Sequence, residues 1–225
     1  MTSLKQKVTH RKNRTVYAKS VKPPTTTMLK RGKNNAKLGD VVLKKKWYGM
    51  RIYSLTLEER VSCPIDCAQW NNCYGNNMPF AHRYDHTHPD FYKMLGAHIS
   101  ELSAKHPEGF VVRLHVLGDF FDLTYVLFWR LLMNLHRNLH VFGYTHQSYL
   151  SEIGKQIMHM NTSWPDRFAV RYSDQFIPYS AWTTDDSTFV PEKGIVCPEQ
   201  LGKTDSCATC AYCWTSTDPV YFLEH

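Results

Sequence analysis

The sequence has no apolar run long enough to cross a membrane, and its first residues, MTSLKQKVTHRKNR, lack the hydrophobic segment of a secretory signal. It also contains no G-x-x-x-x-G-K-S/T phosphate loop, G-x-G-x-x-G fingerprint, G-x-S-x-G elbow or H-E-x-x-H helix. These absences argue against a membrane protein, nucleotide hydrolysis, NAD chemistry, ordinary serine hydrolysis and common metalloproteolysis.

The chain also lacks the even, widely spaced cysteines of a secreted disulfide framework. It has seven cysteines, and they lie in clusters with short spacings. We therefore expect a cytoplasmic protein whose reduced cysteines bind metal.

Acidic residues are nearly absent from the first 50 residues, which contain 14 Lys or Arg and only Asp40. Residues 1–46 also contain few large apolar side chains, so we expect an extended basic arm. Such arms bind nucleic-acid phosphates by releasing counterions. Nucleic acid is therefore an expected partner, and the alternative is a tail that only increases solubility.

Residues 47–175 alternate between segments with strand-like and helix-like hydrophobic patterns. The patterns predict strands within 47–57, 109–121, 139–148 and 167–175, and helices within 88–106, 123–138 and 148–161. This alternation is typical of an α/β fold with a parallel sheet and helical crossovers. Only about four units fit, too few for an eight-unit barrel. We expect a partial, open parallel βα barrel or sheet, or a doubly wound sheet.

The alternation is lost in residues 176–225, which we expect to be a cysteine-rich, metal-binding loop region. Cys207, Cys210 and Cys213 form C-x2-C-x2-C, and Cys197 precedes Pro198. Four thiolates can close a metal site, and this spacing is typical of bacterial iron–sulfur proteins. Zinc usually binds two separated C-x2-C pairs. We expect a 4Fe–4S cluster here, with zinc as the alternative.

The other three cysteines, Cys63, Cys67 and Cys73, form C-x3-C-x5-C directly after the first expected strand. Ligands bind at the carboxyl-terminal edge of such sheets, where this loop begins. A 4Fe–4S cluster held by three cysteines has one iron open to a small molecule. The alternative is a zinc site closed by a nearby histidine, for which the chain offers His82, His86 and His88.

This loop resembles the cluster loop of radical S-adenosylmethionine (SAM) enzymes. Those enzymes usually have C-x3-C-x2-C with an aromatic residue before the third cysteine, whereas here Tyr74 follows Cys73. Gly118 and Asp119, at the end of the second expected strand, resemble the turn that meets the amino group of SAM. The resemblance implies that Gly118, Asp119 and Tyr74 bind the cofactor. Alternatively, Asp119 or Asp122 caps the next helix.

Polar residues in the second expected strand suggest a lined cavity. Arg113 and His115 alternate with apolar residues and are expected on one strand face. Parallel strands are normally apolar on both faces, so Arg113 and His115 join Asp119 as candidate catalytic residues. The alternative is a paired Arg–His contact within the core.

Four sequence blocks, CYG, RLHVLGDF, FGYTHQS and CPEQ…CATCAYCW, resemble the phage gene-product-88 family over scattered parts of residues 35–215. The resemblance implies a phage-encoded protein in a bacterial host, with a host or phage protein as a further candidate partner. It implies no particular activity.

Three functions fit the sequence. The first is a radical-SAM-like iron–sulfur enzyme that acts on a nucleic acid or on a substrate bound to one, with one or two 4Fe–4S clusters and SAM. The second is a zinc-stabilised nucleic-acid-binding protein without catalysis. The third is an iron–sulfur redox protein.

Overall fold

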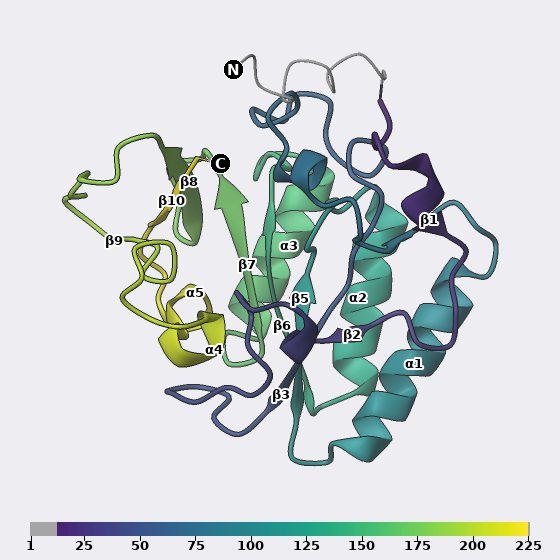
Figure 1. Ribbon diagram of the computed structural model, residues 1–225. Coiled ribbons are helices and arrows are strands. Elements are labelled where there is room, and N and C mark those ends of the chain that lie inside the picture. Colours follow the sequence, from purple (N-terminus) through teal and green to yellow (C-terminus); the bar gives the residue numbers. More distant parts are fainter. Residues whose placement is uncertain (1–12, 225) are drawn as a thin grey trace.

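The computed structural model describes residues 13–224, and its centre is an eight-stranded sheet (Figure 1). The strands lie in the order β2 (Lys30–Arg31), β3 (Arg51–Ser54), β5 (Phe110–Leu114), β6 (Leu139–Thr145), β7 (Phe168–Ser173), β8 (Ser180–Thr184), β10 (Val220–Leu223) and β9 (Ile195–Val196). All neighbours are parallel except β2 and β3, which are antiparallel. A second, two-stranded sheet pairs β1 (Val21–Lys22) with β4 (Arg83–Tyr84).

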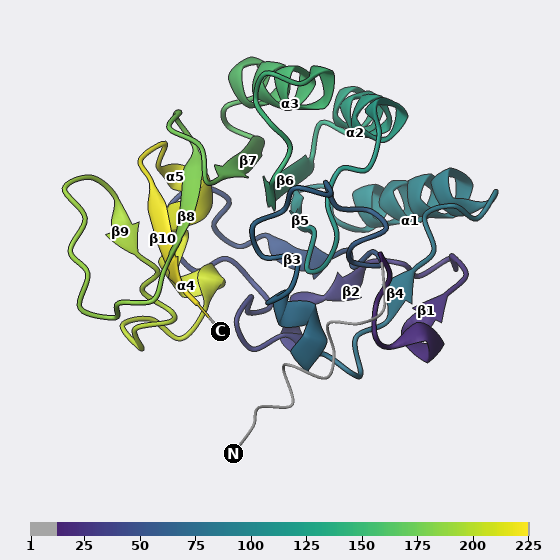
Figure 2. The ribbon, with the colours of Figure 1, turned by 90° about the horizontal axis from the view of Figure 1, so that it is seen from above.

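Three helices connect successive parallel strands and cover the same side of the sheet (Figure 2). They are α1 (Phe91–Lys105), α2 (Leu123–Leu135) and α3 (Glu152–Ser163). Asp122 caps α2 by accepting from the backbone N–H of Tyr125, and Ser151 caps α3 by accepting from that of Gly154. No helix in the described part of the chain is long and apolar enough to span a membrane.

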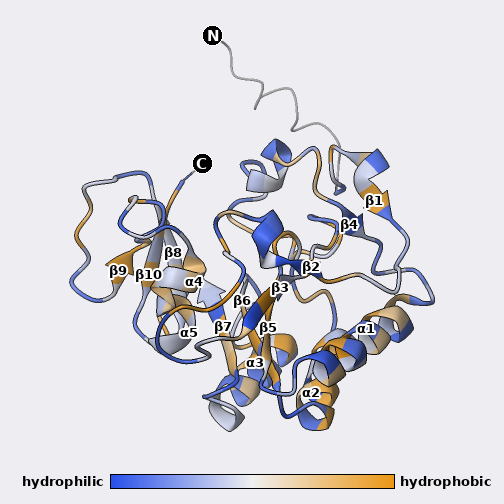
Figure 3. Ribbon diagram, turned by 60° about the horizontal axis from the view of Figure 1, so that its bottom comes forward, coloured by the Kyte–Doolittle hydropathy of each residue, from blue (hydrophilic) through white to orange (hydrophobic). Residues whose placement is uncertain are grey.

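The sheet lies between two hydrophobic layers, and its central strands are mostly hydrophobic (Figure 3). Successive side chains of β5 point to opposite faces of the sheet and enter the two layers alternately. Phe110 and Val112 belong to the cluster shared with α1, α2 and α3. Val111 belongs to the opposite cluster, with Ala208 of α4 (Cys207–Cys210) and Trp214 of α5 (Tyr212–Thr215). The cysteine-rich C-terminal region therefore covers the face that the long helices leave open.

These features confirm the expected α/β fold with a mostly parallel sheet, and the sheet does not close into a barrel. The strands from β3 to β8 follow one another without a reversal, so the sheet is not doubly wound in this part. All three expected helices and all four expected strands are present.

Two regions differ from their expected loop-like character. In the expected arm, residues 13–46 pack onto the domain: Met28 and Val42 are 0% exposed, and Leu29 and Leu38 are 4% exposed. Residues 1–12, the start of the arm, lie outside the described residues. In the C-terminal region, β8, β9 and β10 extend the sheet beyond β7. Both regions acquire their structure by pairing with or packing on distant segments, which local patterns do not reveal.

Candidate metal centre

A cavity of about 470 Å³ opens at the carboxyl-terminal edge of the parallel strands, and all seven cysteines line it. Its wall includes the loop after β3, the ends of β5, β6 and β7, and the C-terminal region. None of the seven cysteines forms a disulfide. Loops from neighbouring parallel strands converge at this edge, which is where such sheets bind ligands. The fold therefore brings together two cysteine groups that are far apart in the sequence.

The thiols of each group influence one another. Burial raises the pKa of Cys63, and the two other cysteines of its group raise it further. Burial likewise raises the pKa of Cys207, and two cysteines of its own group add to the shift. A buried thiolate is unfavourable unless a cation compensates its charge, and a bound metal supplies that charge.

The donor set fits the metals that the sequence suggests, because thiolates suit both iron–sulfur clusters and zinc. Within residues 13–224, no three Cys, His, Asp or Glu side chains already stand in metal-ligand geometry. The fit therefore rests on the chemistry of the donors and on their shared cavity.

A buried ion pair holds the loop that carries Cys63, Cys67 and Cys73. Arg83 is 0% exposed and donates from Nε to Glu59 Oε2 (2.6 Å) and from Nη2 to Glu59 Oε1 (3.1 Å). Its remaining hydrogens go to the carbonyls of Gly75, Met78 and Ala81 and to the hydroxyl of Ser20. One side chain thus joins both ends of this cysteine loop.

The N-terminal segment fastens the same loop from outside. Arg14 pairs with Glu58 at 2.7 Å, and the hydroxyl of Thr15 donates to Glu59 Oε1 at 2.6 Å. The hydroxyl of Tyr17 donates to the carbonyl of Asn76 at 2.6 Å. Residues 13–20 therefore act as a strap over the three-cysteine loop.

A second buried arginine holds the four-cysteine region. Arg171 of β7 is 0% exposed and donates to the carbonyls of Cys213 (3.0 Å), Ser180 (3.0 Å), Asp218 (2.8 Å) and Ser216 (2.5 Å). These carbonyls belong to α5, β8 and the segment before β10. Arg171 therefore ties the last cysteines to the centre of the sheet.

The short helix α4 is also anchored to the N-terminal segment. The backbone N–H of Cys207 donates to Lys37 O (2.7 Å), and that of Ala208 donates to Leu38 O (3.0 Å). Gly39 makes this approach possible: its φ is +76°, and a Cβ there would lie 2.8 Å from Ala208 Cβ. No local sequence pattern around residues 37–39 indicates this contact with α4.

Asp119 lies on the cavity wall and ties two strand ends together. Its Oδ1 accepts from the N–H of Phe120 (2.6 Å), and its Oδ2 accepts from the N–H of His146 (2.7 Å). Thr145 donates a further hydrogen bond, while burial raises the pKa of Asp119 to about 6. Asp122, not Asp119, caps α2. A carboxylate has about four acceptor positions, so Asp119 keeps one for a ligand.

Gly118 also lines the cavity, and its conformation has a packing reason. Its φ is +88°, and a Cβ would lie 2.5 Å from Ser62 Oγ and 2.7 Å from Leu57 Cβ. A side chain here would therefore displace the start of the three-cysteine loop.

Tyr74, the third expected cofactor-binding residue, begins the short helix η4 (Tyr74–Asn77), lines the cavity and is 37% exposed.

Arg113 and His115 line the cavity but do not share a strand face, because β5 ends at Leu114. The Arg113 guanidinium lies over the ring of Tyr144, 4.4 Å from its centroid. His115 turns toward α2, and its Nε2 lies 2.8 Å from the hydroxyl of Tyr125. The alternative, an Arg–His pair within the core, is therefore absent, and each side chain has its own environment.

The three histidines considered as zinc ligands do not line the cavity, although all lie within the described residues. The ring of His86 packs against that of Phe121 in a tilted arrangement, with centroids 4.3 Å apart. The cavity wall instead includes His146, whose Nδ1 lies 3.7 Å from Asp174 Oδ2. The position of His146 near the end of the strand expected within residues 139–148 is the only sequence signal for it.

The fold and the site define an α/β protein with a cysteine-lined cavity at the carboxyl-terminal edge of its sheet. The model of the family described as Gene product 88 matches residues 27–216, so the chain belongs to this phage gene-product family. No curated protein matches the chain. No solved structure matches it either.

The two buried arginines allow the cysteine groups to be loosened separately. Arg83→Met leaves the Glu59 carboxylate buried without its partner, so we expect the free energy of unfolding to fall by about 3–5 kcal/mol. Arg171→Met leaves several carbonyls unsatisfied and is expected to destabilise the protein by a similar amount. Urea denaturation measures both. Alkylation followed by mass spectrometry should show faster reaction of the cysteines within residues 63–73 in the Arg83 variant. In the Arg171 variant, the cysteines within residues 207–213 should react faster.

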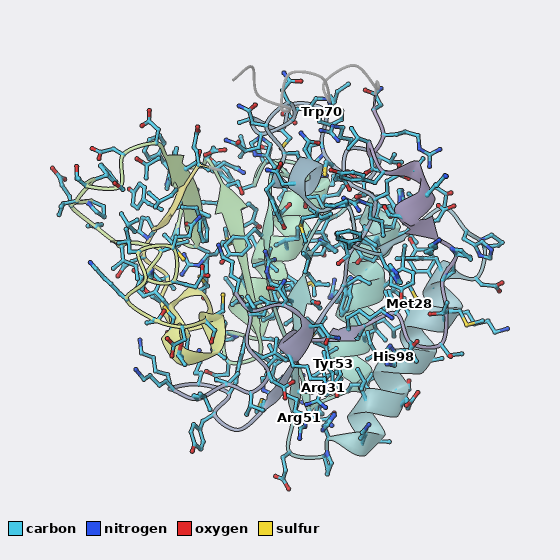
Figure 4. The ribbon with its side chains drawn as sticks, in the orientation of Figure 1. Met28, Arg31, Arg51, Tyr53, Trp70 and His98 are labelled. Atoms are coloured by element: carbon cyan, nitrogen blue, oxygen red, sulfur yellow. The ribbon has the colours of Figure 1, made fainter. Side chains whose placement is uncertain are left out.

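The matched control is Arg31→Met. Arg31 pairs with Asp40 on the surface, its side chain is 37% exposed, and it lies at the end of the molecule opposite Trp70 of the three-cysteine loop (Figure 4). Its loss should cost less than about 1 kcal/mol and leave all seven alkylation rates unchanged. Equal acceleration of both cysteine groups in either arginine variant would contradict this division of roles.

The Cys67 thiol should titrate late in metal-free protein. Burial raises the pKa of Cys67 from 9.0 to about 11. Its thiolate fraction near neutral pH should therefore be about 100-fold below that of an ordinary cysteine. We expect its alkylation rate in folded, metal-free protein to rise until about pH 11, and until about pH 9 in urea. A plateau near pH 9 in the folded protein would refute the effect of burial.

Proposed function

We propose that the protein is an iron–sulfur enzyme of radical-SAM-like type. Cys197, Cys207, Cys210 and Cys213 would hold one 4Fe–4S cluster, closed by four thiolates. Cys63, Cys67 and Cys73 would hold a second cluster, with one iron open to the cavity. The observation that carries the proposal is that all seven cysteines line one cavity, divided into three and four.

The residues around the three-cysteine loop suit a bound SAM molecule. Asp119 keeps one acceptor position for the ammonium group, and Gly118 lets the loop approach it closely. Tyr74 adds an aromatic ring to the wall. A reduced 4Fe–4S cluster with SAM supplies radical chemistry, and the chain's own residues bind and orient the reacting molecules.

A substrate that is, or is bound to, nucleic acid fits the strongly basic N-terminal residues. The sequence of residues 1–12 contains Lys5, Lys7, Arg11 and Lys12. The strap formed by residues 13–20 connects this segment to the three-cysteine loop, so a nucleic acid bound by the tail would be held close to the cavity. We place this activity in the cytoplasm of a bacterial host, where reduced thiols persist and where a host or phage protein is a further candidate partner.

Metal analysis tests the proposal. Protein purified without oxygen should be brown and contain roughly eight irons per chain, because each 4Fe–4S cluster carries four. Replacing Cys207, Cys210 and Cys213 by Ser should leave about four irons, and so should replacing Cys63, Cys67 and Cys73. Each triple variant is the control for the other.

Two outcomes would favour the other functions. A colourless protein with stoichiometric zinc would contradict the iron–sulfur proposal and favour a zinc-stabilised nucleic-acid-binding protein. An iron protein whose reduced electron paramagnetic resonance spectrum does not change when SAM is added would instead be a redox protein. In the proposed enzyme SAM changes that spectrum, and Asp119→Ala weakens the effect.

Binding of the basic tail can be tested with a short deletion. Removing residues 1–12 spares the buried Met28 and Leu38, so the fold should persist. The measurement is the nucleic-acid binding constant K at several salt concentrations. Because the deletion removes about four phosphate contacts, it should reduce the slope of log K against log salt concentration by about three to four. A matched control replaces four exposed lysines far along the chain, Lys93, Lys105, Lys155 and Lys193, by Gln. Equal slopes for the deletion and the control would refute a specific role of the tail.

A further inference from the structure

We propose that Arg113 is the anion-binding residue of the cavity and holds a carboxylate or phosphate group of the ligand, with His115 Nδ1 as a second polar contact. This inference rests on the proposed function only in taking the cavity as the ligand site. It does not depend on which metal the cysteines bind.

The first support comes from comparing the arginines of the domain. Arg83 is saturated by a carboxylate, three carbonyls and a hydroxyl, and Arg171 by four carbonyls. Arg113 donates only to the carbonyl of the next residue, Leu114, at 2.6 Å. Its Nε and Nη2 have no acceptor among the described residues. A guanidinium has five N–H donors, so most of its hydrogen-bonding capacity is left for a ligand.

The second support is that no carboxylate is paired with Arg113 on the cavity wall. Lys37 pairs with Glu199 at 3.3 Å, and Arg60 uses its guanidinium on Asn76 and the carbonyl of Arg14. Arg113 has no carboxylate within 4.0 Å in the described part of the chain. Its stacking on Tyr144 fixes the guanidinium plane without neutralising it. A planar guanidinium held in this way is suited to a carboxylate or phosphate.

The third support is an orphaned atom beside it. His115 is 3% exposed, and its Nδ1 has no hydrogen-bond partner among the described residues. When the Tyr125 hydroxyl donates to Nε2, Nδ1 carries a hydrogen that it can donate. Burial, and after it the charge of Arg113, lowers the pKa of His115, so its ring is neutral near pH 7. Both side chains line the cavity, so a ligand with two polar groups can contact both.

Arg113 also lies between the two cysteine groups, which defines the competing role. Its guanidinium lies over Tyr144, whose hydroxyl donates to Cys213 Sγ at 2.9 Å, and Cys63, Cys67 and Cys73 line the same cavity. An arginine that only balanced metal-bound thiolates would affect metal retention rather than ligand binding. The experiment must therefore measure both quantities.

Quenching of tryptophan fluorescence can report binding, because Trp70, Trp182 and Trp214 line the cavity. The variants are Arg113→Gln, Arg113→Lys and the distant control Arg31→Gln, each as the metal-loaded full chain. The probes are inorganic phosphate, a 5′-phosphorylated oligonucleotide, SAM and decarboxylated SAM. Metal content and circular dichroism are measured on the same samples.

We expect Arg113→Gln to weaken binding of the anionic probe about 10- to 100-fold at unchanged metal content, because a charge-assisted contact is lost. Arg113→Lys should retain part of the affinity, and Arg31→Gln all of it. If the anion is the carboxylate of SAM, Arg113→Gln weakens SAM but not decarboxylated SAM. If it is a substrate phosphate, the variant weakens phosphate and the oligonucleotide but not SAM.

Two results would overturn the inference: wild-type affinity of Arg113→Gln for all four probes, or loss of metal from both Arg113 variants. Failure of the proposed function is distinguishable from either. Zinc in place of iron would end the iron–sulfur proposal, yet Arg113-dependent phosphate binding could still be measured in the zinc protein.

Discussion

The buried ion pair of Arg83 and Glu59 is the interaction on which the site depends most. The loop after β3 contains only the short helix η4 and two residues of β4, so regular backbone hydrogen bonds do not define its shape. Taking two charges out of water is costly, and the cost is offset only when the remaining hydrogen-bonding groups are satisfied. Here the guanidinium has six contacts with five residues, and Glu59 also accepts from Thr15. The loop, the strap and β4 are thereby fixed together.

The same principle recurs on the other side of the cavity. Arg171 has no carboxylate partner in the described chain, and four carbonyls of the C-terminal region surround it instead. Each cysteine group is thus carried by loops and short helices that one buried arginine fixes: Arg83 ties its group to β4 and the strap, and Arg171 ties its group to the central sheet. Arg113 has the same guanidinium group, but only one of its N–H groups has an acceptor within the described chain. We therefore assign its free donors to a ligand.

Sequence periodicity predicted the helices and strands whose apolar residues recur regularly and are buried on one face. The three long helices and the strands β3, β5, β6 and β7 follow from their hydrophobic patterns, and Asp122 was one of two candidate caps of α2. The strands β8, β9 and β10 were not predicted, because SAWTT and IV are short and are stabilised by pairing with distant strands. Met28 and Leu38 are isolated apolar residues in a basic segment, so their burial has no local signature. The partners of Arg83 and Arg171 are likewise set by the fold, and only the grouping of the cysteines was visible in the sequence.

We propose that two separate metal centres face one cavity, one with three cysteine ligands and one with four. Anomalous diffraction at the iron absorption edge, from crystals grown without oxygen, tests it most directly. We expect two iron peaks, one bounded by Cys63, Cys67 and Cys73 and the other by Cys197, Cys207, Cys210 and Cys213. A single peak with ligands from both groups, or peaks only at the zinc edge, would contradict it.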